Sequence, residues 1–203
     1  MLTVLCTPLF SQESGEEDDD EAISIASEQA GLASVYSRGD RIFNIQLGLV
    51  FPLFYYDTDR GKIETNMKMG GTASLGYTYF FTPHFFIGGE VSGMFAPTIG
   101  KNMYYSVPFG FRTGWQFILR RFEIPLSLMI GFAPQSYMDA SYFGFFAKPS
   151  AGIYFRVNPE WSFGLQSAFW IVPQWSSKNE LDNNTSSTHG FFWDISVGVR
   201  YHF

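Results

Sequence analysis

Apolar and polar residues alternate along most of the chain after residue 40, and this pattern predicts β-strands. Phe43, Ile45 and Leu47, for example, alternate with Asn44 and Gln46. A period of two places the two sets on opposite faces of one strand. The alternation returns in eight segments of the length that a tilted strand needs to cross a bilayer. The segments span about residues 41–53, 69–82, 84–95, 104–117, 122–132, 144–157, 161–172 and 191–203.

The connections between these segments alternate between long and short. The long ones are residues 54–68, 96–103, 133–143 and 173–190, and the short ones are residues 82–84, 119–121 and 158–160. Transmembrane barrels have short turns on the periplasmic side and longer loops outside the cell. The sequence therefore predicts an all-β fold, an eight-stranded antiparallel up-and-down transmembrane β-barrel over residues 41–203.

The size of the apolar side chains decides which face of the predicted strands points outward. Phe, Tyr and Trp make up 19% of the 203 residues, and many of them lie on the apolar face. The interior of an eight-stranded barrel is only just wide enough for ordinary side chains. The apolar face must therefore point to lipid, and the face rich in Gly, Ser and Thr must fill the lumen. A soluble barrel with an apolar interior is disfavoured by the same argument.

Seven ionisable residues fall on the face that points into the predicted lumen. They are Glu90, Arg112, Glu123, Lys148, Arg156, Asp194 and Arg200, with His202 at the periplasmic rim. Similar depths on neighbouring strands predict the pairs Glu90–Arg112 and Glu123–Arg156, and Lys148 could meet Asp194 across the lumen. Buried charges need partners, so these pairs are expected to plug the barrel. The alternative is a role in gating or permeation.

Three prolines lie within the strand patterns, at Pro108, Pro125 and Pro149. Proline has no N–H group to donate, and a closed barrel has no free edge where that loss is harmless. We therefore expect local interruptions of the strand ladder, such as bulges or extensions above the bilayer. The alternative is a side opening through which an apolar solute leaves the lumen into lipid.

The first 40 residues differ from the rest in charge. Residues 1–37 hold eight of the 19 carboxylates and no Lys or Arg, which leaves 11 acids against 13 bases in the remainder. The acidic run 13–21 predicts a largely disordered periplasmic extension over residues 12–40, with binding of cations or basic partners as the alternative. Residues 1–11 are expected to be the remnant of a signal peptide. Cys6 lies there, and its lipidation is the alternative to a cleaved leader.

The last segment carries Gly198, Tyr201 and Phe203, with an aromatic residue at the final position. Here the chain resembles outer-membrane barrels, and over residues 40–203 its architecture is similar to the OmpA, OmpX and OmpW types. The resemblance implies a location in the bacterial outer membrane, contact with its lipid, and transient recognition of this terminal signal by the barrel-assembly machinery. We also expect a monomer.

Two functions remain open on the sequence. One is a narrow channel for small apolar solutes, with a possible lateral exit into lipid. The other is a structural or adhesive surface barrel whose loops 54–68 and 173–190 bind a host or envelope partner.

No enzyme, cofactor or metal site is expected from the sequence. The three histidines, His84, His189 and His202, fall in a short turn, a long loop and the periplasmic rim, and only His189 has hydroxyl side chains nearby in sequence. The sequence contains no cluster of Cys and His residues that would suggest a metal site and no glycine-rich phosphate-binding loop. It also contains no stripe of basic and aromatic residues that would suggest binding to nucleic acid.

Overall fold

The computed structural model describes residues 36–57, 61–100, 102–137, 140–175 and 187–203, which form one antiparallel sheet of ten strands. The strands are β1 (Arg41–Asp57), β2 (Gly61–Glu64), β3 (Gly70–Phe80), β4 (Phe85–Pro97), β5 (Met103–Ser106), β6 (Phe109–Leu119), β7 (Phe122–Tyr137), β8 (Ala140–Arg156), β9 (Trp161–Trp175) and β10 (Ser187–His202). No helix long and apolar enough to span a membrane occurs within these described residues.

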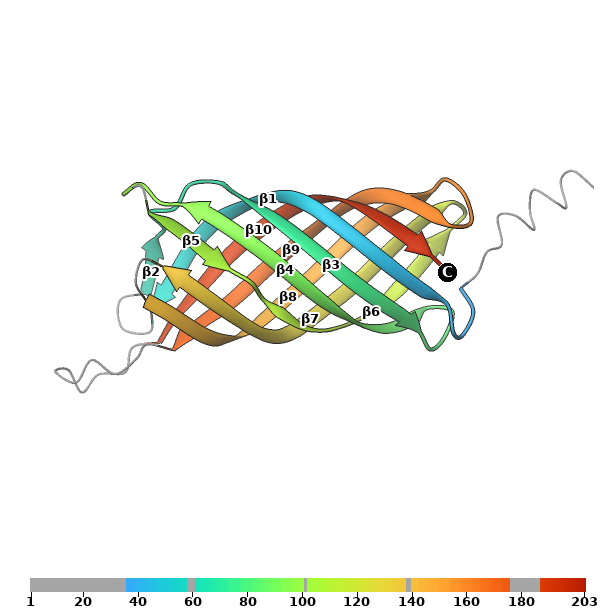
Figure 1. Ribbon diagram of the computed structural model, residues 1–203, viewed down its shortest axis with the longest axis horizontal. Coiled ribbons are helices and arrows are strands. Elements are labelled where there is room, and N and C mark those ends of the chain that lie inside the picture. The colour runs from blue at the N-terminus through green and yellow to red at the C-terminus, as the bar shows by residue number, and fades with distance from the viewer. Residues whose placement is uncertain (1–35, 58–60, 101, 138–139, 176–186) are drawn as a thin grey trace, which may run out of the picture. The chain divides into compact units, whose positions relative to one another are not determined.

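The sheet closes into a ring of eight strands, as the alternation predicts (Figure 1). β1 pairs with β10 from Ile42 opposite His202 to Asp57 opposite Thr188. β5 and β6 lie one after the other between β4 and β7 and act as one strand of the wall. β2 pairs with the end of β1 and adds a short hairpin at the rim. The predicted eight-stranded barrel is therefore confirmed.

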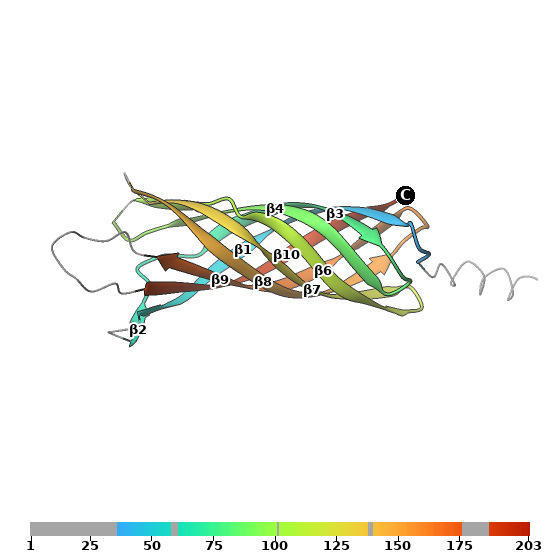
Figure 2. The ribbon, with the colours of Figure 1, turned by 90° about the horizontal axis from the view of Figure 1, so that it is seen from below.

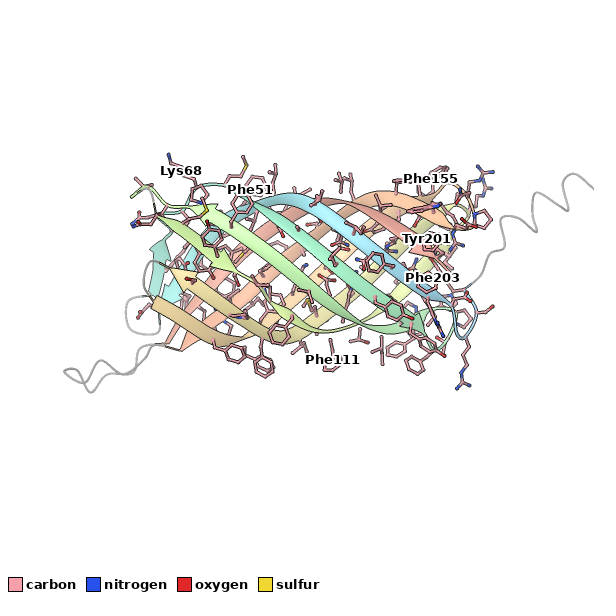
Figure 3. All side chains as sticks on the ribbon, in the orientation of Figure 1. Phe51, Lys68, Phe111, Phe155, Tyr201 and Phe203 are labelled. Carbon is pink, nitrogen blue, oxygen red and sulfur yellow. The ribbon has the colours of Figure 1, made fainter. Side chains whose placement is uncertain are left out.

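The two faces of the wall have the predicted orientation. Leu47 is 60% exposed and Phe111 is 80% exposed on the outer surface, where Figure 3 shows Phe111 pointing away from the ribbon. Lys148 and Asn44 are buried on the inner face. An exterior of this kind is suited to lipid and not to water, because a large contiguous apolar surface is unusual on a soluble monomer.

Aromatic residues pack together near both ends of the outer surface. At the end with the short turns, Trp161 and Phe203 flank Tyr201, with ring centroids 4.8 and 5.6 Å from it. At the other end, the Phe51 and Trp193 rings lie 5.7 Å apart. Figure 3 shows Phe51 and Tyr201 towards opposite ends of the barrel. Two aromatic girdles are typical of transmembrane β-barrels at the two membrane interfaces.

Several strands are longer than a membrane crossing requires. β1 and β8 each have 17 residues, whereas about 9–11 residues suffice to cross a bilayer. The predicted long loop 133–143 is mostly paired, because β7 and β8 remain in register up to Tyr137 opposite Ala140. That prediction was wrong, and the sheet extends beyond the girdle on the side of the long loops.

The prolines interrupt the ladder where the sequence predicts it. The chain leaves the strand between β5 and β6 at Val107 and Pro108, yet Ser92 N donates to Pro108 O at 2.8 Å and Val107 N donates to Pro134 O at 3.0 Å.

The other two prolines have smaller effects on the described ladder. Pro125 lies opposite Gln116 of β6, but no pair joins residues 124–125 to β8. Pro149 lies opposite Leu128, and residues 148–149 are unpaired with β9. The wall is thus irregular on both sides of β8 but continuous around the ring.

Residues 36–40 are ordered against the barrel and differ from the predicted disordered extension. Tyr36 is buried, with its ring stacked 4.2 Å from that of Phe80. Gly39 has a φ of 107°, which favours glycine, and its N–H donates to Phe80 O at 2.9 Å. The predictions for residues 1–11, for Cys6 and for the acidic run 13–21 lie outside the described residues.

Candidate functional site in the barrel lumen

Glu90 of β4 is the centre of an ion cluster inside the barrel. Arg112 Nη1 of β6 lies 3.0 Å from Glu90 Oε2, and Lys148 Nζ of β8 lies 2.7 Å from Oε1. Ser92 Oγ donates to the same Oε1 at 3.0 Å. All three charged side chains are almost fully buried. The predicted Glu90–Arg112 pair is confirmed, and this glutamate cluster carries one more positive than negative charge.

The predicted contact between Lys148 and Asp194 was wrong. Lys148 bonds to Glu90, which comes from the opposite wall, and its ammonium lies 4.8 Å from the centre of the Trp170 ring. Asp194 is buried on β10, but no ion pair joins it to Lys148. A common depth on two strands therefore did not identify the partner, because the direction and reach of each side chain select it.

A second ion cluster lies nearer the periplasmic end around Glu123. Arg156 Nε lies 2.9 Å from Glu123 Oε1, which confirms the predicted pair. Arg200 Nη1 lies 3.7 Å from the other carboxylate oxygen, to which Gln116 Nε2 donates at 3.1 Å. Both oxygens of this buried carboxylate thus face cations or donors, as a buried charge requires.

Tyr36 packs against the periplasmic side of this second cluster. Its hydroxyl lies 3.2 Å from His202 Nδ1, and the Arg156 guanidinium lies 4.9 Å from the centre of its ring. Burial, followed by the charge of Glu123, raises the pKa of the Tyr36 hydroxyl well above its usual value. The residue was not identified from the sequence, because it precedes the first alternating segment.

Between the two clusters, neutral amides and a phenol fill the barrel. Gln46 Nε2 donates to Gln166 Oε1 at 2.7 Å and lies 3.0 Å from the Tyr154 hydroxyl. The Arg200 guanidinium lies 3.5 Å from the centre of the Tyr154 ring. A cavity beside Arg200 has a volume of about 10 Å³, which is room for about one water molecule.

The extracellular half of the lumen is filled by apolar side chains, which the sequence analysis missed. This apolar cluster consists of Val50, Met94, Tyr104, Met129, Ala133, Phe146, Ala168, Trp170, Val172 and Phe192. Tyr104 and Phe192 stack with ring centroids 5.9 Å apart. The signal was present in the sequence as continuous apolar runs, such as Phe169 to Val172, where both faces of a strand are apolar.

Among the described residues, the side chains around the histidines do not have the arrangement of a catalytic triad. His84 lies in the turn before β4 and stacks on Trp115, and His189 lies on β10. His202 Nε2 lies 2.9 Å from Ser162 Oγ and 4.0 Å from Glu123 Oε2. A catalytic triad needs the serine and the acid on different ring nitrogens, and Ser162 is 0% exposed.

The residues of the predicted assembly signal lie on both faces of β10. Gly198 points inward, and a Cβ atom there would lie 2.8 Å from the Tyr154 hydroxyl, so the glycine leaves room for that ring. Phe203 and Arg41 exchange two backbone hydrogen bonds of 3.1 Å at the β1–β10 seam. Recognition of these residues by the assembly machinery stays a prediction.

Solved structures with a similar fold are bacterial outer-membrane proteins. The outer membrane protein OprG of Pseudomonas aeruginosa has 11% sequence identity and a TM-score of 0.56, over 83% of this chain and 97% of OprG. Neisserial surface protein A has 10% identity and a TM-score of 0.55, over 81% and 97% of the two chains. AlkL, solved in lipid bilayers, has 10% identity and a TM-score of 0.53, over 84% and 93%.

The chain therefore has the fold of the small bacterial outer-membrane β-barrels, as its resemblance to the OmpA, OmpX and OmpW types led us to expect. Its apolar exterior faces lipid, and the fold that it shares with these proteins locates it in the bacterial outer membrane. A protein-family model matches residues 16–201, and the chain belongs to that family.

Two relatives by sequence are uncharacterized proteins of Treponema pallidum (strain Nichols). One is 38% identical over 134 residues, which are 66% of this chain and 59% of the relative. The other is 27% identical over 141 residues, which are 64% of this chain and 48% of the relative. The matches thus span about half of the length of these curated relatives.

Proposed function

We propose that the protein is a closed surface barrel that acts through its extracellular end and does not conduct solutes through its lumen. The observation that carries this proposal is the filling of the lumen. The apolar cluster lies directly above the glutamate cluster, and Lys148 joins the two through its contacts with Glu90 and the Trp170 ring.

An ion or polar solute would have to displace several of these side chains. Trp170 and Phe146 are each 0% exposed and pack edge to face, with ring centroids 5.5 Å apart. Moving a charge through an apolar constriction without water is costly. Below it, a solute would meet two ion clusters whose charges already have partners. The lumen therefore favours a structural role for the buried ions.

The extracellular end offers a firm surface for contact with another molecule. The hairpin of β1 and β2 pairs from Phe54 opposite Glu64 to Asp57 opposite Gly61. The Lys62 ammonium lies 4.9 Å from the centre of the Phe54 ring, and Tyr56 is half exposed. Figures 1 and 2 show β2 at the end of the barrel opposite the C-terminus. Binding residues often lie on loops held by a rigid scaffold.

Single-channel recording in planar bilayers tests the closed lumen. The full chain should give no conductance steps, whereas the variant Phe146→Ala combined with Trp170→Ala should give them, because it removes two large rings of the apolar cluster. Trp193→Ala is the matched control, since Trp193 lies outside on the girdle. Conductance steps in the unaltered protein would overturn the proposal.

Adherence of displaying bacteria tests the role of the extracellular end. Bacteria that display the chain should adhere to a host-cell monolayer better than bacteria without it, and Tyr56→Ala combined with Lys62→Ala should reduce this gain several-fold. Leu75→Ala, on the lipid-facing surface, is the control. Equal adherence with and without the barrel would contradict binding to host cells.

A narrow channel for small apolar solutes is the second candidate, favoured by the ladder gaps beside Pro125 and Pro149. If β8 moves apart from its neighbours, an apolar solute could pass from the lumen to lipid. Bacteria that carry the protein should then take up n-octane faster than bacteria without it. Equal uptake removes this candidate.

A further inference from the structure

The lipid-facing surface has a hollow on β6 to β9, with Phe85 of β4 at its side, and its volume is about 650 Å³. Small outward residues form its floor, with Ala151 of β8 opposite Ser167 of β9. Larger side chains form its walls, namely Phe85, Trp115, Leu126, Leu128 and Phe169. The volume falls within the range of sites for small molecules, about 300–1,000 Å³. Many other outward positions of the lipid-facing surface carry large residues, such as Leu47 and Leu75.

The hydroxyl groups around this groove are already engaged within the barrel. Trp193 Nε1 donates to Ser167 Oγ at 2.8 Å, and Thr113 Oγ1 donates to Phe86 O at 3.2 Å. Ser127 Oγ and Ser150 Oγ lie 2.7 Å apart. A polar ligand would therefore lose its own hydrogen bonds with water and gain few in return, which is unfavourable. An alkyl chain loses none, so the groove is suited to a purely apolar occupant.

The groove is continuous with the surface that faces lipid, and it extends from the periplasmic rim towards the middle of the membrane. At the rim, its wall residue Phe85 is the first residue of β4, and Trp115 stacks on His84 of the preceding turn. Ala151, on the floor of the groove, precedes Arg156, the end of β8, by five residues, which is on the order of 17 Å along the strand at about 3.3 Å per residue. An acyl chain of a lipid in the periplasmic leaflet reaches this depth.

Two exposed cations mark the rim below the groove. The turn that joins β6 to β7, which both contribute to the groove, consists of Arg120 and Arg121, and both are exposed. Arginine forms paired hydrogen bonds with phosphate oxygens. The charge of this turn is thus complementary to a phospholipid headgroup at the level where that headgroup would lie.

We propose that this groove binds one acyl chain of a phospholipid of the periplasmic leaflet, with the lipid phosphate at Arg120 and Arg121. The inference is independent of whether the lumen conducts. A second copy of the chain is the rival occupant. Because each strand of the ring is paired with a neighbour on both sides, a second copy has no edge strand to pair with, and it would have to insert a protruding side chain such as Phe111.

Photocrosslinking in bilayers tests the groove. The full chain is reconstituted in phosphatidylethanolamine and phosphatidylglycerol with a trace of phosphatidylglycerol that carries a diazirine in mid-chain. After illumination and digestion, mass spectrometry should find label several-fold enriched on β7 to β9 relative to β1 and β3. Equal labelling of both faces would overturn the proposal.

Filling the groove provides the second measurement. Ala151→Trp should reduce the label on β7 to β9 several-fold, whereas Ala73→Trp, at an exposed outward alanine of β3, should leave it unchanged. Ser167→Leu is the alternative variant if Ala151→Trp does not fold, as judged by its migration on gels before and after heating. A folded variant that keeps full labelling contradicts an acyl chain in the groove.

Two further experiments test the contact with the lipid headgroup and the alternative that a second copy of the chain occupies the groove. Arg120→Ala combined with Arg121→Ala should weaken groove labelling by the phosphatidylglycerol probe, and unchanged labelling would overturn the headgroup contact. Photobleaching steps of single fluorescent molecules in the bilayer give the oligomeric state. A dimer that Phe111→Ala dissociates would overturn the lipid in favour of a second copy.

Discussion

The periplasmic half of the lumen is filled by ions and amides, whereas the extracellular half is filled mainly by aromatic and aliphatic side chains. The two halves respond differently to change. A buried ion pair contributes little net stability, but removal of one partner is severe because the other charge remains buried. An apolar cluster depends on volume and not on any one pair. Loss of a charged side chain should therefore reduce stability most in the periplasmic half. Truncation of a large side chain should reduce it most in the extracellular half.

The largest effect is expected at the centre of the glutamate cluster. Glu90→Ala leaves Arg112 and Lys148 buried without their carboxylate, and it should lower the free energy of unfolding by about 3–5 kcal/mol. Urea unfolding of the barrel in lipid vesicles measures this loss. Glu160→Ala, at an exposed turn position, is the control, and an equal effect of the two variants would contradict the importance of burial.

A smaller effect is expected from lost volume in the apolar cluster. Met129→Ala should cost about 2–3 kcal/mol, towards the low end for a buried methionine because neighbouring side chains can partly collapse into the space. The same urea experiment applies. Met103→Ala is matched in chemistry but lies on the outer face of β5. If the inward and outward variants lose the same stability, the extracellular half is not packed as a core.

The hydroxyl group of Tyr36, at the periplasmic end of the barrel, should make a smaller contribution to stability. Tyr36→Phe keeps the ring on Phe80 but removes the contact with His202, and it should cost about 0.5–1.5 kcal/mol. Urea unfolding near neutral pH measures the difference, and Tyr105→Phe on the outer face is the control. A Tyr36→Phe variant as stable as the unaltered chain would show that only the ring matters.

The stability difference between the unaltered protein and Tyr36→Phe should depend on pH. The folded state holds the Tyr36 proton above the pH at which a free tyrosine, with a pKa of 10.0, would release it. The stabilising contribution of Tyr36 is therefore fully present below about pH 10. It is lost as the pH rises towards the raised pKa of Tyr36 in the folded state. Unfolding at pH 8 and pH 11 should show a smaller alkaline loss in Tyr36→Phe. Identical losses would contradict the burial of this proton.

The smallest effect is expected outside both halves, on the hairpin of β1 and β2. Lys62→Ala removes a cation from the Phe54 ring at an exposed site, which is worth about 0.5–1 kcal/mol. Amide hydrogen exchange of residues 61–64 should become faster, with little change in global stability. Lys68→Ala is the control, because this exposed lysine has no ring contact among those recorded for the described residues.

The sequence predicted the membrane-crossing part of the wall because its two faces meet different surroundings. Leu47 faces lipid and Gln46 faces the lumen, so the alternation is strict there. Where the lumen is also apolar, as around Phe146 and Trp170, both faces look alike and the inner cluster leaves no period of two. Beyond the girdle the strand near Pro134 leaves the lipid, so its outward positions need not be apolar and the alternation no longer distinguishes a strand from a loop.

The ion clusters were predictable only in part. Glu90 and Arg112 lie on neighbouring strands, where depth along the wall is enough to suggest contact. Lys148 reaches Glu90 across the lumen, and sequence position gives neither the direction nor the reach of a long side chain. Tyr36 was missed for a different reason, because a single residue before the first strand carries no periodic signal.

The position of Tyr36 has a mechanical consequence. Its ring sits on Phe80 beside His202, just before the chain enters β1. A pull on the preceding segment reaches this ring first, and it must be extracted from the mouth of the barrel before tension passes to Arg41 and the β1–β10 seam. A pull on the N-terminal side would therefore act on the packing of Tyr36 against Phe80 before it acts on the seam.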